Sequence, residues 1–96
     1  MTTRFDENNI IDYLHNFNKK HIRNTQHSKL RLTNLRYFSF NDAVELIKEN
    51  EPLNIKKQGS KKFALIYPYS DAYDIKIVVA IKDKFINIPT IYKIQR

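Results

Sequence analysis

The hydrophobic period of this 96-residue chain changes at Pro52, and the change constrains the fold more than any other feature. Before Pro52, apolar residues recur at the i, i+3, i+4 and i+7 spacing of amphipathic helices. After Pro52, apolar and polar residues alternate in short runs, which is the period of strands with one buried face. We therefore expect one α+β domain over residues 1–96, with its helices on one face of a sheet.

Two or three helices are expected in the first half of the chain. Ile10, Leu14 and Phe17 recur at i, i+4 and i+7, so a first helix is expected within the N-terminal residues 1–24. A second helical stretch is expected from about Thr25 to Arg36.

A third helix is expected from Ser39 to about Asn50. Ser39 precedes Asp42 by three residues, which is a variant of the capping box at a helix N-terminus. Apolar residues then recur on one helical face from Phe40 to Ile47, and Pro52 prevents the helix from continuing.

About four antiparallel strands are expected between residues 54 and 94, at residues 55–58, 62–67, 75–81 and 85–94. Pro89 has no N–H group for a strand ladder, so it marks an edge or a bulge, and a bulge would reverse the face of every later residue. Without a bulge, one face of the last strand contains Ile86, Ile88, Thr90, Tyr92 and Ile94. The residues expected to be mostly buried are Phe17, Leu30, Phe40, Val44, Ile47, Leu65, Ile77, Val79 and Ile81.

The chain carries 17 Lys and Arg residues against 10 Asp and Glu residues, a formal net charge of +7. Two stretches contain basic residues and no acid: Lys19–Arg36 with six and Asn54–Lys62 with four. Such stretches attract phosphate backbones, and the resulting binding weakens steeply with salt. We expect both stretches on one positive face, although an ordinary lysine-rich surface would show the same composition.

Several kinds of chemistry are excluded by residues that the chain lacks. It has no Cys, which excludes disulfides, thiolate nucleophiles and zinc ribbons. Its single glycine, Gly59, excludes a P-loop and a Gly-rich dinucleotide motif. His15, His21 and His27 are six residues apart, so on one helix their directions differ by about 120°. No metal and no other cofactor is therefore expected.

The longest apolar run, Ile77–Ile81, is far shorter than the roughly 20 residues that cross a bilayer. The first residues include Asp6 and Glu7 and no apolar stretch, so no secretory signal peptide is expected. We expect no membrane contact and a cytoplasmic location, either in the producing cell or, for a delivered effector domain, in a target cell.

Two pairs of residues are suited to phosphoryl chemistry. His27 and Arg31 are four residues apart and share a face if they lie on a helix. The imidazole can move a proton near neutral pH, and the guanidinium can bind a phosphate through two N–H groups. Thr90 and Tyr92 are two residues apart, so on a strand both hydroxyls lie on one side and can bond a phosphate oxygen. Each pair is also common on helices and strands that have no such role.

Basic and aromatic residues supply candidate RNA contacts. Tyr69 and Tyr73, in the polar loop before the third strand, offer rings on which unpaired bases stack. The candidate RNA-binding residues are Arg23, Lys29, Arg36, Lys57, Lys61, Lys62, Tyr69 and Tyr73.

The order of four short motifs resembles a family of ribonuclease toxins. The motifs are Thr25–Arg31, which opens with Thr-x-His27 and has Arg31 four residues later, the capped Phe38–Val44, the Val-rich Ile77–Ile81, and Thr90-Ile91-Tyr92. In this order they are similar to the barnase/EndoU/colicin/RelE-like group, and the similarity covers residues 25–94 as its core.

The resemblance implies a metal-independent endoribonuclease acting on tRNA or mRNA. In that group the ribose 2′-hydroxyl attacks the adjacent phosphate, which gives a 2′,3′-cyclic phosphate and a 5′-hydroxyl. His27 would then be the general acid or base, Arg31 would stabilise the charged phosphate, and Thr90 and Tyr92 would orient it. The resemblance also implies an inhibitor, an acidic antitoxin or immunity protein that covers the basic site.

Two other functions remain open from the residues themselves. A non-catalytic nucleic-acid-binding or ribosome-binding protein would use the same basic stretches and would not need His27. A phage-type inhibitor would act through protein–protein interaction alone.

Overall fold

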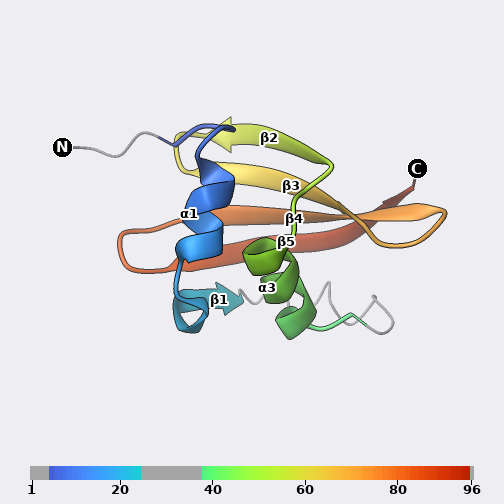
Figure 1. The fold of residues 1–96 in the computed structure, drawn as a ribbon, viewed down its shortest axis with the longest axis horizontal. Helices are drawn as coiled ribbons and strands as arrows, with labels where there is room; N and C mark the ends of the chain where they lie inside the picture. Colours follow the sequence, from blue (N-terminus) through green and yellow to red (C-terminus); the bar gives the residue numbers. More distant parts are fainter. Residues whose placement is uncertain (1–4, 25–37, 96) are drawn as a thin grey trace.

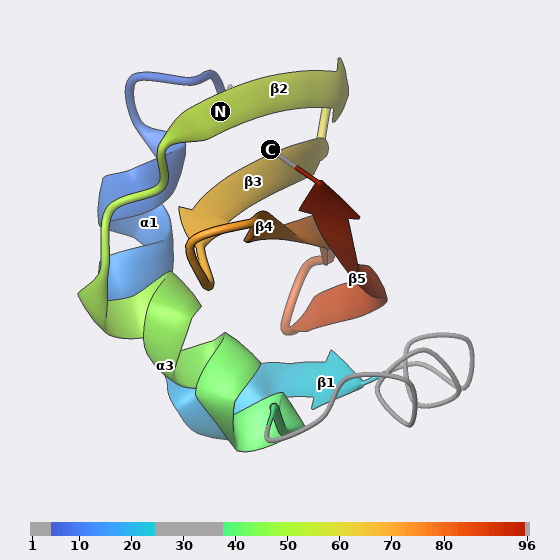
Figure 2. The same ribbon diagram turned by 90° about the vertical axis from the view of Figure 1, so that its right-hand side faces the viewer.

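The computed structural model describes residues 5–24 and 38–95, and these form two layers. Two α-helices pack on one face of a five-stranded sheet (Figure 1, Figure 2). The elements in chain order are α1 (Ile10–Asn16), the 3-10 helix η1 (Lys19–His21), β1 (Ile22–Asn24), α3 (Phe40–Glu49), β2 (Asn54–Gly59), β3 (Lys62–Pro68), β4 (Tyr73–Ile81) and β5 (Ile86–Gln95). The predicted α+β class is confirmed.

The sheet is mixed, and not purely antiparallel as expected. Its strand order is β1-β5-β4-β3-β2, and the four strands from β2 to β5 form the expected antiparallel meander. The additional strand β1 pairs in parallel with β5, with Ile22 opposite Ile86 and Asn24 opposite Ile88. The strand β1 is not predicted from the sequence, because three residues are too few to show an alternating pattern.

The N-terminal helix α1 is short, and hydrogen bonds connect its last turn to α3 and to Asn50, the residue that follows α3. The ammonium group of Lys48 in α3 donates hydrogen bonds to the carbonyls of His15, at 2.7 Å, and of Phe17. The ring of His15 lies 3.0 Å, through Nε2, from the carbonyl of Asn50. A cation at a helix C-terminus satisfies carbonyls that have no partner within the helix. The predicted second helix, Thr25–Arg36, lies outside the described residues.

The capping box predicted for α3 is confirmed. Ser39 Oγ accepts a hydrogen bond from the backbone N–H of Asp42 at 3.2 Å, and the Asp42 carboxylate accepts one from the N–H of Ser39 at 2.8 Å. The helix ends at Glu49, three residues before Pro52. Its buried side is formed by Ala43, Val44 and Ile47.

A bulge in β5 sets which residues of the last strand face the helices. Thr90 pairs with Val78 and Asn87 pairs with Ala80, so Ile88 and Pro89 together lie opposite the single residue Val79. Because proline has no N–H, it is well suited to the extra position of a bulge. The bulge predicted as one alternative is therefore present.

The alternation expected without a bulge is wrong beyond Pro89. Ile86 and Ile88 are fully buried, and so is Ile91, which takes the place expected for Thr90. Thr90 and Tyr92 are half-buried and lie on the opposite face of the sheet.

The core lies between the helices and one face of the sheet. Six of the residues predicted to be buried are buried there: Val44, Ile47, Leu65, Ile77, Val79 and Ile81. Phe17 and Phe40 are half-buried and pack against the edge of the core. Leu30 lies outside the described residues.

One polar group lies within this core. Tyr67 in β3 is 0% exposed, and its hydroxyl has no hydrogen-bond partner in the described part of the chain. Burial, assisted by the negative charge of Glu51, raises the pKa of the Tyr67 hydroxyl well above its usual range. The folded protein therefore resists ionisation of Tyr67 more than the unfolded chain does.

The Tyr67→Phe variant is expected to be more stable than the parent by roughly 0.5–1 kcal/mol near neutral pH, because it removes an unsatisfied buried hydroxyl. Above about pH 10, where the unfolded chain loses the tyrosine proton first, the parent should lose stability by up to about 1.4 kcal/mol per pH unit from this group. Urea unfolding at pH 7 and pH 11 measures both effects. The exposed Tyr73→Phe variant is the control, and a less stable Tyr67→Phe variant would show that the hydroxyl has a bonding partner.

Candidate functional site

The face of the sheet opposite α1 and α3, here called the outer face, is not covered by either described helix (Figure 2). The cross-strand pairs place Lys56, Ala64, Val78 and Thr90 in one row across four strands. The next row contains Asn54, Ile66, Lys76 and Tyr92. On the other side of the first row, Lys62, Ala80, Asn87 and Arg23 follow each other across the sheet.

Two of the aromatic rings near the outer face are paired with cations. The Lys76 ammonium lies 5.5 Å from the ring centre of Tyr92, its cross-strand partner. The guanidinium of Arg23 in β1 lies 4.2 Å from the ring centre of Phe85, which immediately precedes β5. Both pairs have the geometry of cation–π contacts.

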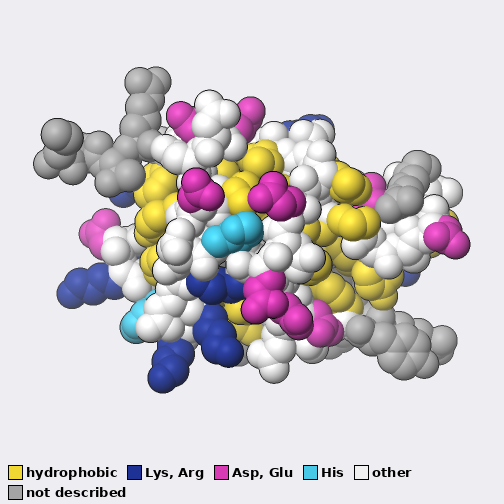
Figure 3. Space-filling model, in the orientation of Figure 1, with side chains coloured by type: hydrophobic (Ala, Val, Ile, Leu, Met, Phe, Trp, Pro, Cys, Tyr) yellow, Lys and Arg dark blue, Asp and Glu magenta, His cyan; other side chains and the backbone are white. Residues whose placement is uncertain are grey.

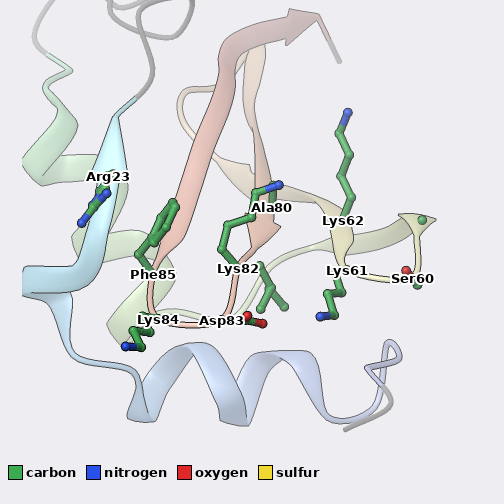
Figure 4. A pocket seen from close by; sticks show the side chains of 11 residues that line it. Arg23, Ser60, Lys61, Lys62, Ala80, Lys82, Asp83, Lys84 and Phe85 are labelled. Atoms are coloured by element: carbon green, nitrogen blue, oxygen red, sulfur yellow. The ribbon is translucent and has the colours of Figure 1, made fainter. Parts of the chain in front are cut away.

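A basic pocket of about 890 Å³ lies at one end of the sheet, where three separate segments meet (Figure 4). The segments are β1, the turn between β2 and β3, and the hairpin between β4 and β5. Its charged lining residues are the cations Arg23, Lys61, Lys62, Lys82 and Lys84 and the single acid Asp83. In Figure 4, Lys62 and Lys82 extend away from α1, whereas Lys61 lies on the side of α1. The cations therefore surround the pocket and do not converge on one point.

In the described part of the chain, charge is unevenly divided between the residues before position 54 and those after it. Residues 54–95, which form β2 to β5, contain eight basic and three acidic residues. The described residues before them, 5–24 and 38–53, contain four basic and seven acidic residues. Several acidic side chains are visible on the helix face of the molecule (Figure 3). A polyanion is therefore attracted to the sheet layer and repelled by much of the helix layer.

The two basic stretches of the sequence meet only in part. Arg23 from the first stretch and Lys61 and Lys62 from the second line the basic pocket together. Lys57 lies apart from them, because its ammonium donates a hydrogen bond of 2.7 Å to the carbonyl of Phe5. Lys19 and Lys20 also lie elsewhere, beside α3. The pocket therefore brings together Arg23 of the first stretch and the end of the second stretch, and leaves out Lys19, Lys20 and Lys57.

The two candidate stacking tyrosines lie at the other end of β4 from the basic pocket. Tyr69 is half-buried and packs edge-to-face on Phe38, with ring centres 5.9 Å apart. Tyr73 is 37% exposed, and the Lys93 ammonium lies 4.8 Å from its ring centre. The structure thus gives Tyr69 a packing role and leaves Tyr73 accessible but remote from the pocket.

Of the four candidate catalytic residues, the structure describes two. Thr90 and Tyr92 lie on the outer face, next to Val78 and Lys76 respectively. His27 and Arg31 lie outside the described residues, as do Lys29 and Arg36 from the candidate RNA contacts. Convergence of His27 and Arg31 with Thr90 and Tyr92 therefore stays a prediction.

Three lysines near the site, Lys76, Lys82 and Lys84, are not among the residues predicted from the sequence. Lys82 and Lys84 flank Asp83 in a short hairpin, so they do not belong to a basic stretch without acids. Two lysines in a tight hairpin beside a basic turn were the signal that could have identified the pocket.

Within residues 5–24 and 38–95, no three His, Asp or Glu side chains gather closely enough to hold a metal ion. The helices of this part of the chain are also too short or too polar to cross a bilayer.

The fold and the site define a small α+β protein with a basic pocket at the end of an outer sheet face. Residues 8–79 match the model of the MJ0788 family, and the chain belongs to this family. Searches of the curated proteins and of the solved structures found no match. The family match contains no connection to the barnase/EndoU/colicin/RelE-like group, so that resemblance depends on the short motifs alone.

Proposed function

We propose that the protein binds RNA through the basic pocket and the adjoining outer face. The observation that carries the proposal is the pocket itself, in which three segments bring together five cations and one acid. Lysine and arginine side chains in such a cluster neutralise phosphates and release condensed counterions. Because the cations surround the pocket, they suit several phosphates of one chain better than a single small anion.

The charges elsewhere on the molecule also favour RNA binding on the sheet side. The outer face adds Lys56 and Lys76 to the cations of the pocket. The helix layer contributes Asp42, Glu45 and Glu49 from α3, whose charge disfavours a polyanion there. A basic surface that faces away from an acidic one is the charge distribution of a nucleic-acid-binding domain.

A second candidate function, RNA cleavage, is favoured by the position of Thr90 and Tyr92. Both lie on the outer face, which continues from the basic pocket, and their hydroxyls are the groups suited to orient a phosphate. His27 follows Asn24, the last residue of β1, by three positions, and β1 is the neighbour of β5 in the sheet. In this candidate, His27 moves the proton, Arg31 stabilises the phosphate charge, and no metal takes part.

RNA binding is tested by fluorescence anisotropy with a labelled RNA across a salt series. The parent should show a steep fall in affinity with salt, with a slope of about −0.7 per phosphate contact in a single strand. A variant with Arg23, Lys62 and Lys82 all changed to Gln should bind roughly tenfold or more weakly at low salt and show a shallower slope. The matched control changes the exposed Lys19, Lys20 and Lys93 to Gln, which removes the same charge outside the pocket.

The control variant should retain most of the affinity and the slope of the parent. Equal losses in the two variants would show that net charge, and not the pocket, determines binding. The cleavage candidate is tested by incubation with total tRNA and with translating ribosomes, followed by analysis of the ends. Fragments with 2′,3′-cyclic phosphate and 5′-hydroxyl ends support cleavage, whereas bound but intact RNA contradicts it.

A further inference from the structure

The outer face carries a line of groups along β5 that leads away from the basic pocket. Phe85 lines the basic pocket, and the guanidinium of Arg23 lies 4.2 Å from the centre of its ring. Asn87, Thr90 and Tyr92 follow on the same face, because the bulge at Ile88 and Pro89 shifts the alternation of β5 by one residue. Two aromatic groups and two polar side chains therefore form one line, with an aromatic group at each end.

The neighbouring strand packs its own outer-face side chains closely beside this line. Ala80, Val78 and Lys76 of β4 lie opposite Asn87, Thr90 and Tyr92 respectively. Beyond Val78, Ala64 of β3 continues the row. Val78 is 5% exposed and Ala64 is 0% exposed, so the half-buried side chains along β5 provide the accessible surface, while Lys56 and Lys62 at the far side hold positive charge.

These features discriminate between single-stranded and duplex RNA. Unpaired bases present their faces for stacking on tyrosine and phenylalanine rings and on arginine guanidinium planes. A duplex hides these faces inside its helix and is recognised mainly through its backbone and minor groove. No described helix lies on the outer face where it could contact a groove.

We infer that the outer face binds single-stranded RNA along β5, with phosphates at the basic pocket and unpaired bases over the line from Phe85 to Tyr92. The inference rests on the proposed RNA binding and deepens it by naming the form of the RNA. It requires that the Tyr92 ring contributes to affinity separately from the lysine charges. The ring and the charges can therefore be tested independently.

The experiment measures anisotropy of a labelled RNA of about a dozen nucleotides, alone and annealed to its complement. The single strand is expected to bind more tightly than the duplex. Tyr92→Leu should weaken single-strand binding by roughly 5- to 100-fold, since base–aromatic stacking contributes about 1–3 kcal/mol per base, and should leave the salt slope unchanged. Tyr92→Phe should restore binding, because it keeps the ring.

Tyr13→Leu is the matched control, since Tyr13 is a half-buried tyrosine of α1, on the helix side of the molecule, and its affinity should equal that of the parent. Far-UV circular dichroism and thermal melting establish that each variant is folded. Equal affinity for duplex and single strand, or unchanged binding by Tyr92→Leu, would overturn the inference and leave RNA binding in place. Absence of all RNA binding, together with binding of polyglutamate, would overturn both and favour an acidic protein partner.

Discussion

If the protein cleaves RNA as in the second candidate function, exchange of His27 for alanine is expected to lower the cleavage rate by roughly 10²–10⁴-fold, which is the usual contribution of a general acid or base. An imidazole titrates near neutral pH, so it can accept the proton of the 2′-hydroxyl or donate one to the leaving oxygen. RNA affinity should stay unchanged, because the cations of the basic pocket remain. Single-turnover cleavage and anisotropy, measured on the same RNA, separate the two effects.

The control for this variant is His21→Ala, which removes an exposed imidazole from η1 and should cleave like the parent. Arg31→Lys should also slow cleavage, because it keeps the charge but loses the planar pair of N–H donors that bind a phosphate. Full cleavage activity in His27→Ala would remove His27 from the mechanism. RNA bound without cleavage by the parent would leave only the binding function.

The Ile91→Asp variant is expected to be unfolded at 25 °C. Ile91 is 0% exposed between the sheet and the helices, so the variant loses the packing of the isoleucine, about 2–5 kcal/mol, and also buries an unpaired carboxylate, which costs about 3–5 kcal/mol. Small domains are stable by only about 5–15 kcal/mol, and the combined loss is of the same size. Far-UV circular dichroism and the dispersion of the proton NMR spectrum measure the outcome.

The neighbouring Thr90→Asp is the matched control. Thr90 is half-buried on the outer face, where water reaches the side chain, so the variant should remain folded with a much smaller loss. A folded Ile91→Asp together with an unfolded Thr90→Asp would contradict the bulge and restore the regular alternation of the strand.

Local signals in the sequence were sufficient for most of the secondary structure. The capping box of Ser39 and Asp42 predicts the start of α3 because the interaction is complete within four residues. The alternating runs predict β3, β4 and β5 because one face of each is buried. The strand β1 could not be predicted in this way, because its pairing with β5 is a contact between residues about 64 positions apart.

The site was less predictable than the fold. A run of lysines in the sequence predicts that one segment of the chain is basic. A basic pocket also requires that several such segments lie close together in the folded protein. Lys82 and Lys84 enter the pocket because the hairpin between β4 and β5 ends beside the turn that carries Lys61 and Lys62. Lys57 belongs to the same basic run as Lys61, but its side chain is engaged by the carbonyl of Phe5.

The uneven division of charge gives the described part of the molecule an electric dipole that points from the helix side to the sheet side. Residues 54–95 have a net charge of +5, and the described residues before them have a net charge of −3. A dipole of this kind orients the protein in the electric field of a polyanion before the two molecules touch. More of the first contacts are therefore made by the sheet side. The orienting torque weakens as the Debye length falls, to about 8 Å at physiological ionic strength, and the association rate constant should fall with it.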